Sequence, residues 1–284
     1  MQDYSIYLSD AENVSNPLTI FVDIFRNMTE KNLKTTISHK KTTLGTWIQI
    51  PDTFTTEIIA RSGFDWLAID LEHGLIDLET AFRLIQAIDS CGVVPLVRLH
   101  INDASTIRRV MDGGAGGVIV PMVNTAEDAR LAVEAAKYPP AGKRSYGLGR
   151  ACNFGESFEK YLRTINNRSV VVIQIEHIDA VANLGEILKV PGIDAIIIGP
   201  YDLSGSLGIP GQFDNPEFIK ILETIIAEVK KSPVALGLHI VHPDEEILQE
   251  RIRQGFTFIG YGMDTIFLLE GSRLAVNSVR SCLQ

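Results

Sequence analysis

The sequence predicts an α/β fold, a single (β/α)8 TIM barrel preceded by an N-terminal extension. From Leu44 onward, short β-branched runs alternate with longer amphipathic stretches, which is the pattern of repeated βα units around a parallel sheet. The 284 residues, 45% of them hydrophobic, can bury one large core, and one barrel takes about 250 residues. Eight consecutive units favour a closed barrel over an open doubly wound sheet, since no Gly-x-Gly-x-x-Gly motif opens a helix after any strand.

The expected strands are short apolar runs at residues 44–50, 66–72, 94–99, 117–123, 170–176, 195–200, 234–241 and 256–262. Stretches with helical spacing lie between and after them, at residues 53–61, 78–90, 104–111, 126–137, 179–188, 216–230, 243–253 and 264–279. Most of these stretches end at a glycine or proline, as at Gly63 and Gly255. The connection over residues 138–169 is unusually long, and loops longer than about 12–15 residues in compact domains are usually functional or disordered.

Residues 1–40 differ in composition from the rest and are expected to form an extension that caps or packs on the barrel domain of residues 41–284. The stretch 4–16 is polar, and residues 17–33 fit a single helix. Residues 31–43 are charged, threonine-rich and typical of a loop.

Composition argues against several classes of protein. The formal net charge is −9 and the pI is about 5.2, so the chain lacks the basic footprint of a nucleic-acid-binding protein or a membrane-surface helix. The longest apolar runs are too short to span a bilayer. Three widely spaced cysteines without a Cys-x-x-Cys pair, and no positively charged signal-peptide start, predict a cytoplasmic protein. We therefore expect no nucleic acid and no membrane among its partners.

In a barrel of this kind the active site lies at the C-terminal ends of the strands, where the βα loops begin. Only residues that end strands or begin these loops qualify as candidates. Buried charges without partners are expensive, so charged side chains gathered there demand counter-charges or a metal. The polar candidates are Gln49, Asp70, Glu72, His73, Arg98, His100, Gln174, Glu176, His177, Tyr201, Asp202, His239, His242 and Asp264.

Glu176 and Asp202 end adjacent strands, which lie close together in a barrel. Two facing carboxylates repel one another unless a cation lies between them. Ligation by oxygen alone suits Mg²⁺ or Mn²⁺, with water and substrate filling the remaining positions. Alternatively, each carboxylate caps the helix that follows it, and Asp202 before Leu-Ser has the pattern of an N-cap. As a pair on consecutive strands beside Gln174, the two carboxylates favour a metal site.

Two further side chains lie on the same face. A lone histidine is more often a structural hydrogen-bonding residue than a catalyst, but His73 follows a strand end and its chemistry suits proton transfer near neutral pH. Arg98 ends an apolar strand and needs an anionic partner, either a site carboxylate or the substrate. In the long connection, a solvated loop face is the expected setting for at least two of Lys143, Arg144 and Arg150.

The chain resembles the HpcH/HpaI aldolase family, the class II metal-dependent pyruvate aldolases of the phosphoenolpyruvate/pyruvate barrel superfamily. The similarity runs in order from about Leu44 to beyond Asp264. One tetrapeptide would be weak support, but seven segments in register indicate the family. These segments are Leu44-Gly-Thr-Trp, Asp70-Leu-Glu-His73, Val97-Arg98, Val120-Pro-Met-Val, Gly142-Lys-Arg144, Gln174-Ile-Glu176 and Gly199-Pro-Tyr-Asp202-Leu-Ser.

The resemblance implies a role for each matching residue. Glu176 and Asp202 would bind a divalent metal, Mg²⁺, Mn²⁺ or Co²⁺, which chelates the carboxylate and keto oxygen of pyruvate. Gln174 and the backbone near Gly199–Tyr201 would hold the keto acid. The substrate-binding set is then Gln174, Gly199, Pro200, Tyr201 and Asp202.

The catalytic set implied by the resemblance comes from other strands. His73 would accept the proton, directly or through a metal-bound water. Asp112 matches the acidic partner that raises the basicity of that histidine, although Met-Asp-Gly-Gly by itself indicates only the end of a helix. Arg98 would stabilise the enolate as charge develops, and Asp70 would support the His73 and Arg98 pair.

Three positions depart from the family pattern. Tyr201 stands where a small residue is frequent, His177 replaces a small hydroxyl residue, and His239 stands where the pocket wall is often apolar. These departures predict a changed pocket for the second substrate. Family members commonly form trimers or hexamers by exchanging the last helix, so residues 264–279 are expected to pack on a neighbouring subunit.

The leading functional hypothesis is a metal-dependent aldolase or lyase that joins or separates pyruvate and an aldehyde through a pyruvate enolate, acting on 4-hydroxy-2-oxo acids. A second hypothesis within the superfamily is a lyase or condensing enzyme for citrate-like or CoA-linked acids, although no adenine-nucleotide-binding signature is evident. A third is a barrel that binds a keto acid without turnover. That hypothesis predicts broken catalytic positions, and none of the matching positions is broken.

Overall fold

The computed structural model describes residues 32–282. The polar stretch at residues 4–16 lies outside that range, as does nearly all of the helix expected at residues 17–33. The boundary between an extension and a barrel at residue 40 remains a prediction, and the compact unit that contains the barrel begins at Leu33. Among the described helices, none is both long and apolar enough to cross a membrane.

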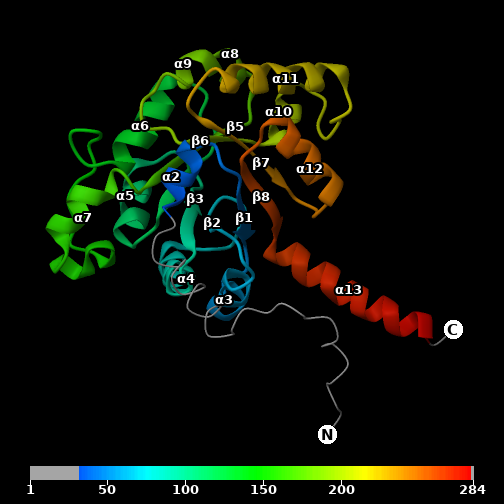
Figure 1. Cartoon of the computed structure of the whole chain (residues 1–284), viewed down its shortest axis with the longest axis horizontal. Helices are drawn as coiled ribbons and strands as arrows, with labels where there is room; N and C mark the ends of the chain where they lie inside the picture. The colour runs from blue at the N-terminus through cyan, green and yellow to red at the C-terminus, as the bar shows by residue number, and fades with distance from the viewer. Residues whose placement is uncertain (1–31, 283–284) are drawn as a thin grey trace, which may run out of the picture. The chain divides into compact units, whose positions relative to one another are not determined.

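Eight parallel strands close into a barrel in which each strand pairs with its sequence neighbours and β8 pairs with β1 (Figure 1). All eight expected strands are confirmed, because β-branched and aliphatic runs bounded by turn residues identify strands buried on both faces. The strands are β1 (Thr43–Ile48), β2 (Trp66–Asp70), β3 (Val94–Arg98), β4 (Gly117–Val120), β5 (Val170–Ile175), β6 (Ala195–Ile198), β7 (Ala235–Ile240) and β8 (Phe258–Met263).

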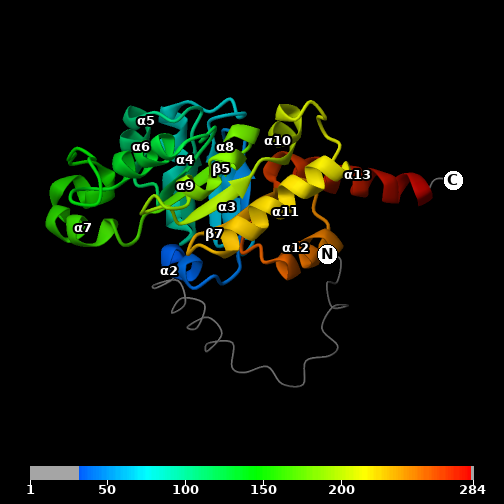
Figure 2. The same cartoon turned by 90° about the horizontal axis from the view of Figure 1, so that it is seen from above.

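Helices connect the strands and lie around the outside of the barrel (Figures 1 and 2). Four of the βα loops end in an aspartate that caps the next helix by accepting a backbone N–H, a contact worth about 1 kcal/mol. The helices are α2 (Leu33–Ser38), α3 (Thr53–Ala60), α4 (Leu78–Ser90), α5 (Ala104–Asp112), α6 (Ala126–Ala136), α7 (Phe158–Ile165), α8 (Ile178–Ala182), α9 (Leu184–Ile187), α10 (Pro200–Ser206), α11 (Pro216–Lys230), α12 (Glu245–Gln254) and α13 (Asp264–Cys282).

The structure adds detail to, or differs from, the expected elements at several places. The single helix expected at residues 179–188 is two short helices, α8 and α9, which meet at Asn183. The strand expected to reach Pro200 ends at Ile198, and Pro200 instead occupies the first turn of α10, where its fixed φ favours a helix start. The long connection over residues 138–169 contains α7 and a short 3₁₀ segment, Arg150–Gly155.

The barrel interior and the helix-facing layer form two apolar cores. Along β6, Ala195 and Ile197 point inward while Ile196 and Ile198 face the helices, as the period of two in a strand requires. The interior is filled by large rings, with Trp66 stacked on Phe258 at 4.4 Å between centroids. Gly45 makes room for this stack, because a Cβ there would lie 2.0 Å from the Trp66 ring.

The N-terminal end of the barrel is covered by α2, where a loop was expected. Leu33 and Ile37, one turn apart, are buried among the interior residues. Lys34 forms an ion pair with Asp194, and the other oxygen of Asp194 accepts the backbone N–H of Val171 at 2.8 Å. This apolar pair of residues fixes α2 as a helix despite the polar composition of its surroundings.

The last helix, α13, extends away from the barrel in both views (Figures 1 and 2). Its residues from Leu268 to Arg280 are exposed. They include four large apolar side chains with 49–73% exposure, Leu268, Leu274, Val276 and Val279. An apolar helix of this kind normally covers or is covered by another protein surface.

Candidate active site

A buried ion pair lies at the C-terminal ends of β2 and β3. The guanidinium of Arg98 donates from Nε to Asp70 Oδ1 at 2.9 Å and from Nη2 to Oδ2 at 2.7 Å. Asp70 is fully buried and also accepts from Gln49 Nε2 at 2.8 Å and from the backbone N–H of His73 at 3.2 Å. Burial alone would raise the pKa of Asp70, but Arg98 and these hydrogen bonds outweigh it and hold the pKa below its ordinary value.

Glu176 follows β5 directly and is buried, and each of its two carboxylate oxygens accepts a hydrogen bond. Oε1 accepts the backbone N–H of Met122 at 2.6 Å, and Oε2 accepts from Gln174 Nε2 at 2.6 Å. Met122 has a φ of 52°, a strained value for a residue other than glycine, and this turn aims its N–H at the carboxylate. Gly199 is equally constrained, because a Cβ there would lie 2.8 Å from Glu176 Oε2.

Asp202 lies in the first turn of α10 and is exposed. Burial raises the pKa of Glu176, and the charge of Asp202 acts in the same direction. The two predicted metal ligands therefore lie close enough to repel one another. The predicted N-cap role of Asp202 does not hold, because Gly199 occupies the N-cap position of α10.

Glu72 is a third carboxylate at this site, and the sequence did not assign it a role. It lies 3.1 Å from Arg98 through Oε2. Burial raises the pKa of Glu72 to about 7 against the opposing charge of Arg98, and the carboxylates of Glu176, Asp70 and Asp202 add to the effect of burial. The sequence feature that could have identified Glu72 as a site residue is its position just after a strand end, between Leu71 and His73.

The donor set fits a divalent cation. Glu72, Glu176 and Asp202 repel one another, and a cation would relieve this repulsion. The amide oxygen of Gln174 is buried without a hydrogen-bond partner, so it is free to accept from a bound water. No three acidic, histidine or cysteine side chains within residues 32–282 converge as a metal-binding group. Water and substrate would therefore complete the coordination, as is usual for Mg²⁺.

The predicted histidines take different positions. His73 is exposed at the mouth of the barrel, beside Asp70. His239 lies inside the barrel, stacked on Trp47 at 4.5 Å, and its Nε2 donates to the carbonyl of Gly262 at 2.9 Å. Burial lowers the pKa of His239 to about 4, so its ring is neutral near pH 7. His177 caps α8 by accepting the backbone N–H of Asp179 at 3.2 Å.

Asp112 is not brought to His73 within one chain. It ends α5, at the opposite end of the barrel from the strand ends that carry the other candidates. Its Oδ1 accepts from Arg144 Nη2 at 2.6 Å. Arg144 is fully buried and lies over the ring of Tyr138 at 4.5 Å. A solvated setting was expected for at least two of Lys143, Arg144 and Arg150. Arg144 is not one of them, whereas the side chains of Lys143 and Arg150 are 76% and 31% exposed.

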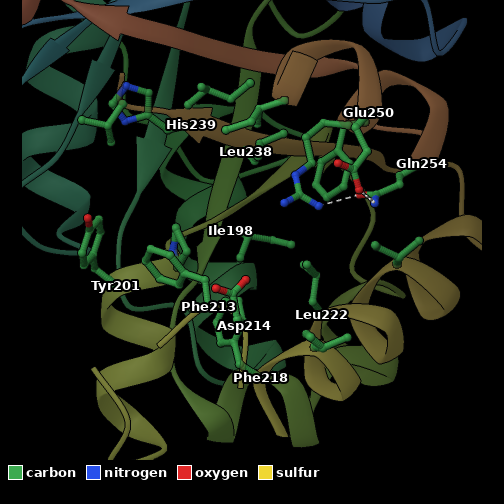
Figure 3. Close-up of a pocket in the computed structure, with 18 of the residues that line it drawn as sticks. Ile198, Tyr201, Phe213, Asp214, Phe218, Leu222, Leu238, His239, Glu250 and Gln254 are labelled. Atoms are coloured by element: carbon green, nitrogen blue, oxygen red, sulfur yellow. Dashed lines mark hydrogen bonds between the residues drawn. The ribbon is translucent and has the colours of Figure 1, made fainter. Parts of the chain in front are cut away.

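A cavity of about 570 Å³ lies between α11, α12 and β7 (Figure 3). Pro200, Tyr201 and His239 are among its lining residues, but Glu176, Asp202 and Arg98 are not. Tyr201 is 61% exposed and meets the ring of Phe213 edge-on at 5.0 Å. The cavity therefore borders the carboxylate cluster through Tyr201 without containing it.

The sequence matches known proteins over most of its length. A model of the family described as HpcH/HpaI aldolase/citrate lyase matches residues 43–270. A 2-keto-3-deoxy-L-rhamnonate aldolase from Escherichia coli is 37% identical over 225 residues, covering 78% of this chain and 83% of that protein. A 4-hydroxy-2-oxo-heptane-1,7-dioate aldolase from Salmonella dublin is also 37% identical, over 231 residues, covering 81% of this chain and 87% of that protein.

Solved structures give the same picture. An HpcH/HpaI aldolase/citrate lyase family protein from Burkholderia cenocepacia superposes with a TM-score of 0.83 at 28% identity, covering 88% of this chain and all of that one. The citrate synthase SbnG superposes with a TM-score of 0.76 at 29% identity, covering 89% of this chain and 99% of that one. Both neighbours match nearly the whole of the described barrel.

Replacing Asp70 with asparagine should lower the free energy of unfolding by about 3 kcal/mol near neutral pH, because a buried partner of Arg98 loses its charge. The lowered pKa means that this contribution is fully present above the ordinary value of 3.8 and is lost as the pH falls below it. Urea unfolding of wild type and Asp70→Asn at neutral and acidic pH measures the difference. The control variant Asp214→Asn, at an exposed loop residue, should change the free energy of unfolding little. If the stability difference between wild type and Asp70→Asn grew in acid instead of shrinking, the prediction would be contradicted.

Proposed function

The chain belongs to the HpcH/HpaI aldolase/citrate lyase family, and we propose that it makes and breaks the bond between pyruvate and an aldehyde. It is a carbon–carbon lyase. In cleavage its substrates would be 4-hydroxy-2-oxo acids. The observation that carries the proposal is the pair of carboxylates, Glu176 and Asp202, at the ends of adjacent strands and beside the Arg98–Asp70 ion pair.

Glu176 and Asp202 would hold a divalent ion, Mg²⁺, Mn²⁺ or Co²⁺, whose Lewis acidity polarises the keto group of the substrate. Gln174 supports this role, because its Nε2 fixes Glu176 and its free Oε1 is left for a bound water. The first-turn N–H groups of a helix have no intrahelical partners. Those of Tyr201 and Asp202 are therefore available to the keto acid carboxylate.

In cleavage, a base removes the C4 hydroxyl proton, the C3–C4 bond breaks and the aldehyde leaves. The electron pair remains on the pyruvate part as an enolate, which then takes up a proton at C3. Arg98 would stabilise this negative charge, because its guanidinium is held in one orientation by Asp70 and needs no rearrangement. His73 would be the proton acceptor, placed beside this pair by its backbone N–H contact with Asp70.

For Asp112 to support His73, a second copy of the chain must bring it to the barrel mouth. Exposed apolar side chains on both sides support this arrangement, with Leu75 97% exposed near His73 and Phe154 76% exposed in the segment that follows Arg144. The exposed apolar residues of α13 support a homotrimer or homohexamer in which this helix is exchanged. Cys91 and Cys152 are free thiols, which supports the proposed cytoplasmic location.

A second candidate function is the condensation or cleavage of citrate-like acids. The likeness to a citrate synthase at a TM-score of 0.76 supports it. Release of citrate from oxaloacetate and an acetyl donor, with no reaction toward aldehydes, would favour this function over the aldol reaction.

Glu176→Gln and Asp202→Asn should each lower the metal-dependent release of pyruvate from 4-hydroxy-2-oxo acids by about a hundredfold or more, because charge stabilisation at the keto oxygen is lost. Initial rates with Mg²⁺, Mn²⁺ and Co²⁺ measure this effect. Glu186→Gln is the matched control, since it removes a carboxylate that is 70% exposed on α9 and does not belong to the strand ends. Full activity of either ligand variant in the presence of a chelator would contradict the proposal.

His73→Asn and Asp112→Asn should each be nearly inactive alone, because the proton acceptor pair is broken in both. If the pair forms between two copies, mixed oligomers of the two variants contain some sites with both native residues. Dissociating and reassembling a mixture should therefore restore part of the wild-type rate. A mixture that forms mixed oligomers, shown by differently tagged subunits, and yet recovers no activity would exclude the two-chain pair.

A further inference from the structure

The mouth of the barrel contains acidic side chains but almost no fixed positive charge. Within residues 32–282, none of the segments between a strand end and the helix that follows it contains lysine or arginine. The same holds for the whole of residues 199–215, which include α10, and β8 leads directly into α13. These segments are residues 49–52, 71–77, 99–103, 121–125, 176–177, 199–215 and 241–244. The carboxylates that they contribute are Asp52, Glu72, Asp77, Asp103, Glu176, Asp202, Asp214 and Asp244.

Arg98 is the cation at the strand ends, and its charge is already matched. It contacts Asp70 through two hydrogen bonds and Glu72 at 3.1 Å. A divalent ion on Glu176 and Asp202 would be matched by those two carboxylates. The carboxylate and keto oxygen of the keto acid would bind directly to this ion. A second anionic group on the substrate finds no fixed cation left in the described loops.

Two of the histidines at the mouth, His177 and His242, already face a carboxylate. Histidine is only partly charged near neutral pH. The Nδ1 of His177 accepts a hydrogen bond from the backbone of Asp179 and lies 3.3 Å from the Asp179 carboxylate. The ring of His242 is likewise 3.2 Å from Glu270. Each of these rings already has a carboxylate of its own.

A second copy that supplied Asp112 would also bring the arginines near it. Arg108 and Arg109 precede Asp112 in α5, and neither forms an ion pair among the described residues. The segment beside Asp112 carries Arg144 and Arg150. Arg144 is bound to Asp112 itself at 2.6 Å, and Arg150 is bound to Asp89 at 2.6 Å. Arg144 and Arg150 would therefore arrive with their charges paired.

Neutral side chains border the metal ligands instead. Tyr201 is next to Asp202 in the chain and is 61% exposed, and Met122, whose backbone N–H holds Glu176, is 49% exposed. A phenol can donate to or accept from a hydroxyl group, and a thioether provides apolar contact. Such a border suits an uncharged alkyl or hydroxylated chain.

We infer that the acceptor aldehyde is uncharged, so that the substrate carries a single carboxylate rather than a second carboxylate or a phosphate. This inference rests on the proposed aldol function and narrows it. The two curated relatives are equally similar to the chain, at 37% identity, so identity does not choose between a monoacid and a dioate. The negative charge of the barrel mouth favours the monoacid over the dioate. It also disfavours citrate-like acids, which have three carboxylates.

The test compares two substrates of the same chain length on the full-length protein, 4-hydroxy-2-oxoheptanoate and 4-hydroxy-2-oxoheptane-1,7-dioate. With Mg²⁺ or Mn²⁺ present, kcat/KM for pyruvate release should be about tenfold or more higher for the monoacid, because the second carboxylate meets like charges. The preference should shrink as salt screens those charges. An equal or higher kcat/KM for the dioate would overturn the inference.

Tyr201→Lys adds a cation at the border, and Tyr201→Gln is the neutral control. The ratio of kcat/KM for the dioate to that for the monoacid should rise with lysine and not with glutamine. A ratio that stays the same in both variants, or that rises equally, would overturn the role of charge. Absence of pyruvate from either substrate with every metal would overturn the proposed function as well, whereas preference for the dioate would leave that function standing.

Discussion

One buried ion pair organises the mouth of this barrel. Asp70 is fully buried at the end of β2, and its carboxylate binds Arg98 from β3, Gln49 from the end of β1 and the backbone N–H groups that begin the next loop. A single carboxylate therefore joins three neighbouring strands. It also fixes the turn that carries Glu72 and His73, and it holds the only arginine of the described strand ends in one orientation. Without this ion pair, Glu72, His73 and Arg98 would not be held in fixed positions relative to one another.

The remaining charges follow from that constraint. Because Asp70 already neutralises Arg98, the carboxylates of Glu72, Glu176 and Asp202 have little compensation from the protein. Burial makes this deficit more costly, since the local dielectric is low. A divalent ion would compensate the negative charge of these carboxylates, and the substrate carboxylate would complete its coordination. The same balance that calls for a metal leaves no positive charge for a second anionic group, so metal dependence and substrate charge have one physical origin.

The sequence predicted the barrel well because strand runs and glycine stops are local signals, and the carboxyl ends of consecutive strands must meet at one end. This reasoning placed Asp70, Arg98 and Glu176 correctly. It did not predict the burial of Arg144, which depends on Asp112, 32 residues away, and on the rings of Tyr138 and Tyr161 in the same long connection. Nor does a single sequence show how Asp112 could reach His73, because the helix end that it indicates lies at the opposite end of the barrel.

The central claim is that Glu176 and Asp202 bind one divalent ion that in turn binds the keto acid. Oxalate has the charge and shape of the pyruvate enolate and is not turned over, so it separates binding from catalysis. Titration of Mn²⁺ into the full-length protein, followed by its electron paramagnetic resonance signal, should give one site per chain, and oxalate should bind only when Mn²⁺ is present. Oxalate binding of equal affinity without metal, or Mn²⁺ binding that survives Glu176→Gln and Asp202→Asn together, would contradict the account.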